Sequence, residues 1–197
     1  DRREAVIRRV GAACRNGRQA YWVCTAIDES DSLDLEAAEA TRDYLDEALP
    51  EVRIGMVHGR MKASEKAEMM ANFKSGFIQL LVATTVIEVG VDVPNASLMI
   101  IDNAERLGLA QLHQLRGRVG RGVVESHCLL LYRQPLSETA RERLQVMQQT
   151  HDGFVIAEAD LRIRGPGELL GTRQTGMAQF RIARLPEHES LLIEAQA

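Results

Sequence analysis

The sequence predicts an α/β fold, in which a parallel sheet with helices on both faces is followed by a small helical hairpin and a loop. Apolar, β-prone segments alternate with segments of helical periodicity up to about residue 134, and such alternation is typical of parallel sheets. Several of these apolar segments are continuous, as expected for strands that are covered on both faces. Beyond that point only helical patterns and a glycine-rich segment remain.

The elements of the sheet domain can be placed in order. A first helix is expected at about residues 2–15, because Asn16-Gly17 is a usual C-cap pair. The expected strands are 20–26, 53–58, 80–84, 97–102 and 127–133. The helices between them are expected at about 35–49, 63–74 and 108–117. Pro50 follows the first of these, as a helix stop should, and the second carries a helical stripe of Ala63, Ala67, Met70 and Phe73.

The last third of the chain predicts two short helices. Ala140, Leu144 and Met147 form one apolar stripe at helical spacing, and a turn separates it from a second stripe, Phe154, Ala157 and Leu161. Two short helices in sequence indicate a helical hairpin. RGPGELLGTRQTG (164–176) then holds four glycines and a proline, which predicts an ordered loop or a broken helix. We expect a sheet domain at 1–134 and a hairpin and loop segment at 135–197.

Composition permits this arrangement, and the charge is uneven. The 197 residues are 45% hydrophobic, enough for one α/β domain with a small appendage. The net charge of −4 gives no overall sign of nucleic-acid binding. However, residues 34–51 hold seven acids against one base, whereas 107–124 contain no acid. An acidic outer helix can mask a basic working face, so local charge is the better guide.

The three cysteines, Cys14, Cys24 and Cys128, show neither metal-ligand spacing nor a disulfide framework. We expect Cys24 and Cys128 to be buried small hydrophobes because they lie in apolar segments. The sequence shows no apolar segment of membrane length and no signal peptide, so the expected location is the reducing cytoplasm. The sequence begins at Asp1 in the middle of a pattern, so we expect the chain to be a piece of a longer protein.

The segment QLHQLRGRVGRG (111–122) carries the clearest chemical signal. It reads largely as helix, yet it holds three glycines, each costing roughly 1 kcal/mol against alanine in a helix interior. Arg118 and Arg121 share one face if the helix continues that far, beside a bare strip at Gly117 and Gly120. Two fork-shaped donors beside such a strip suit an oxyanion such as a triphosphate. The alternative is a solvated basic helix end.

Three further candidate positions directly follow expected strands, where ligands of open parallel sheets bind. They are His58-Gly59, Thr84-Thr85 and Asp102-Asn103. Thr84 and Thr85 can offer hydroxyl and backbone donors to a phosphate. Ordinary capping of the next helix explains these threonines as well, and His58-Gly59 also fits a simple turn.

The motifs resemble those of a known family. QLRGRVGR resembles motif VI of superfamily 2 helicases, and ATTVIEVGVDVPNA (83–96) resembles the preceding motif V. The coupling motif shared by the RecG and Mfd families is similar to HDGFVIAEADLRIRGPGELLGTRQTG (151–176), and the residues here resemble RecG more than Mfd. The resemblance covers about 21–184. It implies the second RecA-like lobe of an ATP-dependent DNA helicase that remodels branched DNA by fork regression and Holliday junction migration in recombination and repair.

The resemblance also implies roles for residues near the nucleotide. Arg118 and Arg121 are expected to reach the γ-phosphate of ATP bound on another lobe and to stabilise charge in the transition state. Gln114, one turn earlier, is expected to help position the cleft. Gly90 and Asp92 are expected to lie at the edge of the nucleotide.

Other roles implied by the resemblance concern DNA. The residues expected to approach the DNA backbone are His58, Gly59, Thr84 and Thr85. Those expected to couple cleft closure to movement on duplex DNA are Arg143, Arg164 and Gln174. Considered without the family, the last three read as surface arginines and a loop amide.

The sequence contains neither a G-x-x-x-x-G-K-[ST] loop nor a DExH-type carboxylate pair. ATP and Mg²⁺ are therefore expected to bind mainly to an N-terminal RecA-like lobe of the same polypeptide, and this chain alone is expected to be inactive. The other expected partners are branched duplex DNA and a wedge domain, with no membrane. Two alternatives stay open: the motor lobe of an Mfd-type transcription-repair coupling translocase, and a nucleic-acid-binding module without motor activity.

Overall fold

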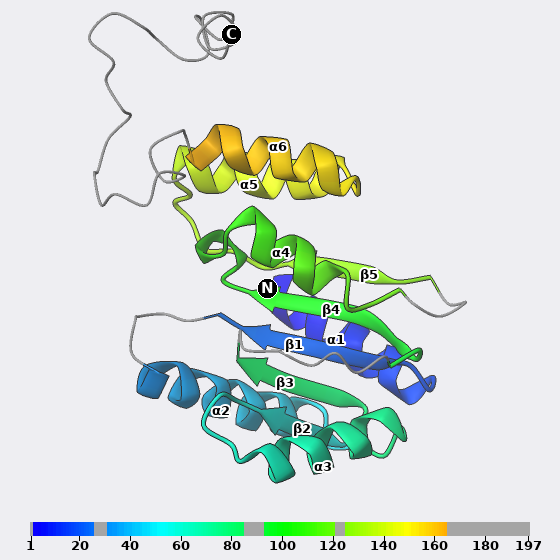
Figure 1. Cartoon of the computed structure of the whole chain (residues 1–197). Helices are drawn as coiled ribbons and strands as arrows, with labels where there is room; N and C mark the ends of the chain where they lie inside the picture. The colour runs from blue at the N-terminus through cyan, green and yellow to red at the C-terminus, as the bar shows by residue number, and fades with distance from the viewer. Residues whose placement is uncertain (1, 26–30, 85–92, 121–124, 165–197) are drawn as a thin grey trace, which may run out of the picture.

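The computed structural model describes residues 2–25, 31–84, 93–120 and 125–164. Five strands form one parallel sheet in the order β2-β3-β1-β4-β5 (Figure 1). They are β1 (Gln19–Cys24), β2 (Ile54–Val57), β3 (Leu80–Thr84), β4 (Ala96–Asp102) and β5 (His127–Leu130). The helices are α1 (Arg2–Arg15), α2 (Asp31–Ala48), α3 (Ala63–Lys74), α4 (Leu109–Arg116), α5 (Glu138–Gln149), α6 (Gly153–Arg164) and the short 3₁₀ helix η1 (Ala104–Arg106). The predicted fold class is confirmed.

Both faces of the sheet are covered, which explains the continuous apolar strands. Successive residues of a strand point to opposite faces, and the core divides accordingly into two clusters. Ala20 and Trp22 of β1 belong to the cluster with α1 and α2, whereas Tyr21 and Val23 belong to the cluster with α3 and α4. Trp22 at the centre of the sheet is completely buried. The hydrophobic burial in both clusters is the main stabilisation of this layered arrangement.

The predicted stripe of α3 is only half correct. Met70 and Phe73 are buried, and the Phe73 ring packs on Tyr21 with the ring centroids 4.9 Å apart. Ala63 and Ala67 are exposed. α3 packs over β2, an edge strand of four residues, so the sheet is too short here to cover the first turns of the helix.

The helical hairpin forms as predicted, but the expected buried face of α6 is wrong. α5 buries Ala140 and Met147, in agreement with its stripe. In α6, Phe154 is 90% exposed and Leu161 is 51% exposed. The inward residues are instead Ile156, Ala159 and the half-buried Ile163, which share one helical face. Contact with α4 and α5 selects this face, so the hairpin joins the same hydrophobic cluster as α4.

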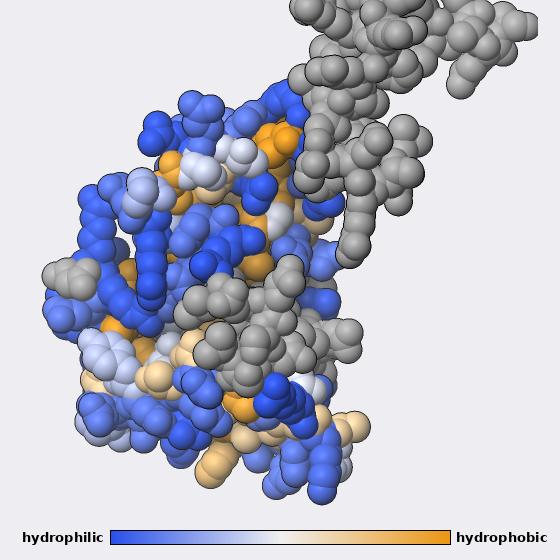
Figure 2. Space-filling view, turned by 90° about the vertical axis from the view of Figure 1, so that its left-hand side faces the viewer, coloured by the Kyte–Doolittle hydropathy of each residue, from blue (hydrophilic) through white to orange (hydrophobic). Residues whose placement is uncertain are grey.

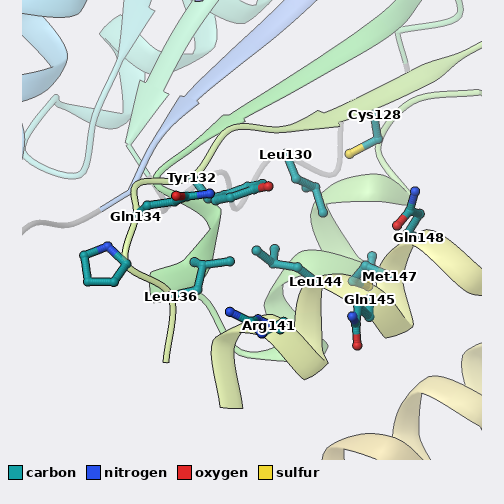
Figure 3. A pocket seen from close by; sticks show the side chains of 11 residues that line it. Cys128, Leu130, Tyr132, Gln134, Leu136, Arg141, Leu144, Gln145, Met147 and Gln148 are labelled. Atoms are coloured by element: carbon teal, nitrogen blue, oxygen red, sulfur yellow. The ribbon is translucent and has the colours of Figure 1, made fainter. Parts of the chain in front are cut away.

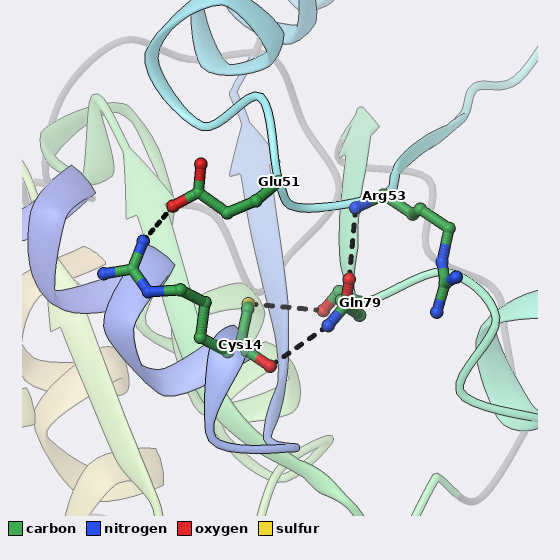
Figure 4. A network of polar contacts seen from close by, with 5 residues as sticks. Cys14, Glu51, Arg53 and Gln79 are labelled. Carbon is green, nitrogen blue, oxygen red and sulfur yellow. Dashed lines mark hydrogen bonds and ion pairs between the residues drawn. The ribbon is translucent and has the colours of Figure 1, made fainter.

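Side-chain amides hold the amino ends of the strands in place. Gln79 donates to the Cys14 carbonyl (3.1 Å) and accepts from the Arg53 N–H (3.2 Å), which ties the end of α1 to the start of β2 (Figure 4). The buried Gln19 donates to the carbonyls of Phe73 and Ile78. Buried amides are stabilising when they are hydrogen-bonded in this way. These amide hydrogen bonds stabilise the amino edge of the sheet.

The thiols are structural in the described part of the chain. Cys14 and Cys24 are buried as free thiols, whereas Cys128 is only partly buried. The expectation of burial is therefore confirmed for Cys24 and met in part for Cys128. Burial raises the pKa of all three thiols to about 11. Among the described helices, none is both long and apolar enough to cross a bilayer.

A matched pair of substitutions tests the core. Phe73 is fully buried, whereas Phe77 is 58% exposed. Phe73→Ala should lower the free energy of unfolding by about 3–5 kcal/mol because it leaves a cavity, and Phe77→Ala should cost under about 1 kcal/mol. Urea denaturation followed by circular dichroism measures both values. Equal losses would contradict the assigned packing.

The raised thiol pKa values give a test that depends on pH. At pH 8, iodoacetamide should label the folded chain about 100-fold more slowly than the urea-unfolded chain, because thiolate is the reactive form. A thiol whose pKa rises from 9.0 to about 11 on folding stabilises the fold below pH 9 and loses this contribution as the pH rises through 11. Mass spectrometry after timed labelling should find Cys128 modified first. Labelling of all three at the unfolded rate would overturn their burial.

Candidate functional site

The predicted strand-end positions converge at the carboxyl edge of the sheet. The register places Thr84, Cys24 and Asp102 side by side across β3, β1 and β4. His58 follows Val57, which pairs with Ala83 in the neighbouring strand. Figure 2 looks onto this edge, where hydrophilic side chains predominate. A parallel sheet therefore gathers these polar residues, which are far apart in the sequence, on one surface.

His58 and Thr84 are held differently at this edge. His58 is half-buried, and its Nδ1 atom is buried with no hydrogen-bond partner in the described part of the chain. Such an atom in a native structure calls for a partner from solvent or a ligand. Thr84 is only 8% exposed. The carbonyl of Gly59 accepts from Lys66 Nζ at 2.9 Å, so this backbone group is already used within the chain.

Asp102 acts in the structure as part of a lock. Its Oδ2 atom lies 2.7 Å from Arg3 Nη1, and the Arg3 guanidinium carbon lies 5.4 Å from the centroid of the Trp22 ring. Thr25 Oγ1 donates to the Asp102 carbonyl at 2.8 Å. The next residue, Asn103, has a left-handed φ of 51° and starts η1. Asp102 thus fastens α1 to the carboxyl edge, which the sequence alone did not indicate.

The α4 helix (Leu109–Arg116) agrees with the expected 108–117 to within one residue at each end, and it ends before Arg118. Leu109, Leu112 and Leu115 are buried, whereas Gln114 is exposed on the other side. The helix ends at Arg116, so the helical face expected to unite Arg118 and Arg121 does not continue along α4. The half-buried Arg118 follows in a turn, its N–H donating to the Leu115 carbonyl at 3.0 Å.

The turn after α4 depends on glycine at residue 120. Gly120 has a φ of +85°, and a Cβ at this position would lie 2.5 Å from Ser126 Oγ. Any other residue would meet both backbone strain and a close contact. Gly120 therefore serves chain geometry directly after the helix, whereas Gly117 has an ordinary helical φ of −69°.

Arg116 makes contacts that sequence reasoning missed. Its Nη1 atom donates to the Met147 carbonyl (3.1 Å) and to the Thr150 carbonyl (2.8 Å), both at the end of α5. Its Nη2 atom lies 3.2 Å from His113 Nδ1. Burial lowers the pKa of Arg116 from its ordinary value, yet arginine stays charged at neutral pH. No residue type in the sequence indicates these contacts, because both carbonyl acceptors belong to a distant segment of backbone.

The two predicted coupling arginines of the described region meet near the start of α4. Arg143 of α5 donates from Nη1 to the Leu107 carbonyl, at 3.4 Å. Arg164, at the end of α6, pairs with Asp160 at 3.0 Å, and its Nη2 would lie 3.4 Å from a Cβ added to Gly108. The hairpin thus contacts both ends of α4, through Arg143 and Arg164 at one end and Arg116 at the other.

A groove separates β5 from α5 (Figure 3). It has a volume of about 670 Å³, with Cys128 and Leu130 of the strand facing Leu144 and Met147 of the helix. Glutamine side chains, among them Gln145 and Gln148, lie along its rim. The lining is mixed, because apolar side chains share it with uncharged amides and with the cation of Arg141.

Several predicted residues lie outside the described ranges, namely Thr85, Gly90, Asp92, Arg121 and Gln174. Within the described ranges, no group of three His, Cys, Asp or Glu side chains could hold a metal ion. The described residues thus form two separate polar places, one at the carboxyl edge with His58 and Thr84 and one in the turn after α4 with the cation of Arg118.

Comparison with known proteins agrees with this geometry. Residues 2–123 match the family model of the helicase conserved C-terminal domain, and residues 150–196 match that of ATP-dependent DNA helicase RecG, domain 3, C-terminal. ATP-dependent DNA helicase RecG of Escherichia coli strain K12 is 66% identical over 196 residues, 99% of this chain and 28% of that protein. The RecG of Bacillus subtilis strain 168 is 47% identical over 170 residues, 86% of this chain and 25% of that protein.

A solved structure described as RecG bound to a three-way DNA junction matches with a TM-score of 0.74 and 43% identity. The match covers 98% of this chain and 24% of that one. This chain thus spans about a quarter of the length of the relatives that it matches. The two family models follow one another along the sequence, as the sheet domain and α6 do. The chain belongs to the family of helicase conserved C-terminal domains, and its residues 150–196 are similar to the C-terminal part of domain 3 of RecG.

Proposed function

We propose that this chain is the second motor lobe of a RecG-type ATP-dependent DNA translocase that remodels branched DNA in recombination and repair. One observation carries the proposal: α4, which holds Gln114 and leads into Arg118, packs directly on the hairpin whose second helix begins the RecG-specific match. A nucleotide-sensing segment in contact with a DNA-moving segment is what a translocase requires.

The nucleotide role belongs to the segment after α4. Arg118 and Arg121 act as arginine fingers on ATP held by another lobe of the same polypeptide, where Mg²⁺ accompanies the phosphates. Such arginines stabilise charge on the transferred phosphoryl group and are worth about 10³-fold in rate or more. Gln114 faces the cleft from its exposed position on α4, while Gly90 and Asp92 line the nucleotide edge.

The DNA role belongs to the carboxyl edge of the sheet. His58, Gly59, Thr84 and Thr85 contact DNA phosphates there. The buried Nδ1 atom of His58 supports this assignment because none of the described residues supplies it with a hydrogen-bond partner. Backbone and hydroxyl donors of this kind position DNA without reading its sequence.

Coupling belongs to the second part of the chain, with Arg143, Arg164 and Gln174 linking cleft closure to duplex movement. We divide the chain into a RecA-like lobe at 1–134 and a coupling segment at 135–197. Its partners are an N-terminal RecA-like lobe, a wedge domain and branched duplex DNA, namely forks and Holliday junctions, in the cytoplasm.

The alternatives are an Mfd-type motor and a module without motor activity. RecG and Mfd share a coupling motif in this part of the chain, yet the family model that matches residues 150–196 is the one for RecG. This match favours RecG over Mfd. If the chain were a module without motor activity, it would bind DNA, and replacing Arg118 would not change ATP turnover in the complete protein.

In the complete protein, Arg121→Ala or Arg118→Ala should lower DNA-stimulated ATP turnover by about 10³-fold while junction binding stays largely intact. The reason is that an arginine finger acts mainly in the transition state. Phosphate release with forked DNA and gel-shift affinity measure the two properties. Arg42→Ala is the matched control, since Arg42 pairs with Asp43 on α2, which packs on the opposite face of the sheet.

Equal losses of turnover and junction affinity would instead assign the two arginines to DNA phosphates. The isolated chain, which contains no phosphate-binding loop, serves as the negative control for turnover. Robust ATP hydrolysis by the isolated chain would contradict the proposal that ATP binds mainly to another lobe.

A further inference from the structure

The end of α5 is a place where the chain needs donors. The last four carbonyls of any α-helix have no partner within the helix. At the end of α5, the Thr150 N–H donates a hydrogen bond to the Val146 carbonyl at 3.2 Å. Arg116, at the end of α4, donates hydrogen bonds to the carbonyls of Met147 and Thr150. A cation at this end also meets the negative end of the helix dipole.

Arg116 is itself held in orientation by α4. Arginine cannot accept a hydrogen bond, so Nδ1 of His113 must accept from Nη2 of Arg116. The other nitrogen, Nε2, then carries the proton and faces the start of α6, where it would lie 3.2 Å from a Cβ added to Gly153. His113 and Arg116 therefore touch the hairpin at both sides of its turn, α5 through the arginine and α6 through the histidine.

We propose that Arg116 is a positioning residue that makes the hairpin follow the motion of α4 during ATP turnover. The inference rests on the proposed function and adds a residue to its coupling machinery. Arg116 stands two residues before Arg118 in the sequence, yet its hydrogen bonds go to carbonyls 31 and 34 residues further on. A displacement of the nucleotide-sensing segment therefore reaches α5 through charged hydrogen bonds, which are shorter and stronger than neutral ones.

The contact also has a counterpart at the other end of α4. Arg143 of α5 donates to the carbonyl of Leu107, two residues before α4 begins, so hydrogen bonds hold the hairpin at two separated points, one just before α4 and one at its end. Two points of attachment resist rotation of the hairpin about either one. Removing Arg116 leaves the Arg143 contact as a pivot, which allows the hairpin to stay folded but turn independently of α4.

The test is made in the complete protein with Arg116→Ala, Arg116→Lys and Arg162→Ala. Arg162 of α6 pairs with Glu142 of α5 at 2.9 Å, so its removal loses an arginine contact inside the hairpin and none with α4. ATP turnover and junctions unwound are measured on one preparation. Arg116→Ala should keep DNA-stimulated turnover near the parent rate and lower the junctions unwound per ATP by about fivefold or more. Arg116→Lys should restore part of this ratio, and Arg162→Ala should leave it unchanged.

A second readout does not depend on activity. In Arg116→Ala, amide hydrogen exchange across 138–164 should quicken about tenfold or more while β1, β3 and β4 keep their protection. An unchanged ratio and unchanged exchange would overturn the inference, and so would a loss of turnover in proportion to unwinding. If the parent protein lacks DNA-stimulated turnover, the proposed function fails, and the exchange experiment alone decides whether Arg116 holds the hairpin to α4.

Discussion

The packing of α4 between the sheet and the helical hairpin is the constraint on which the account depends. Three leucines bury one side of α4 in the core that it shares with the sheet. The hairpin adds Met147, Ile156 and Ala159 to the same cluster. Arg116 then joins the carboxyl end of α4 to the end of α5 by hydrogen bonds. Burial of apolar side chains holds the hairpin against α4 but is not directional. The hydrogen bonds of the Arg116 guanidinium set the orientation of the hairpin relative to α4.

Different side chains hold the two edges of the sheet. At the amino edge, Gln19 and Gln79 satisfy backbone groups that the turns leave open. At the carboxyl edge, Arg3 and Asp102 hold α1 in place, while His58 has a buried nitrogen that finds no hydrogen-bond partner among the described residues. Since all five strands run in parallel, every strand end contributes to the same surface. The turn after α4 lies at the amino end of the sheet, because Gly120 approaches Ser126 directly before β5. Each end of the sheet therefore carries residues of the predicted site.

Local patterns predicted most of the fold, and long-range contacts explain what they missed. Asn16-Gly17 marked the end of α1 correctly, with Gly17 at a φ of +80°. The inward face of α6 was not predictable, because its two candidate stripes are both spaced as helical faces and only packing against α4 and α5 selects between them. Arg116 was missed because its partners are backbone carbonyls of a distant segment, which leave no residue-type signal in the sequence. Hydrogen bonds of this kind become visible only in three dimensions.

The central claim is that α4 and the hairpin move as one body, and a distance measurement tests it most directly. Spin labels placed at Ala110 of α4 and Glu158 of α6, both exposed, would report the separation in the complete protein after its native cysteines are replaced. The account predicts one narrow distance distribution that does not change when a non-hydrolysable ATP analogue and forked DNA are added. A second population, or a shift of roughly 5 Å, about one helical turn, would contradict it.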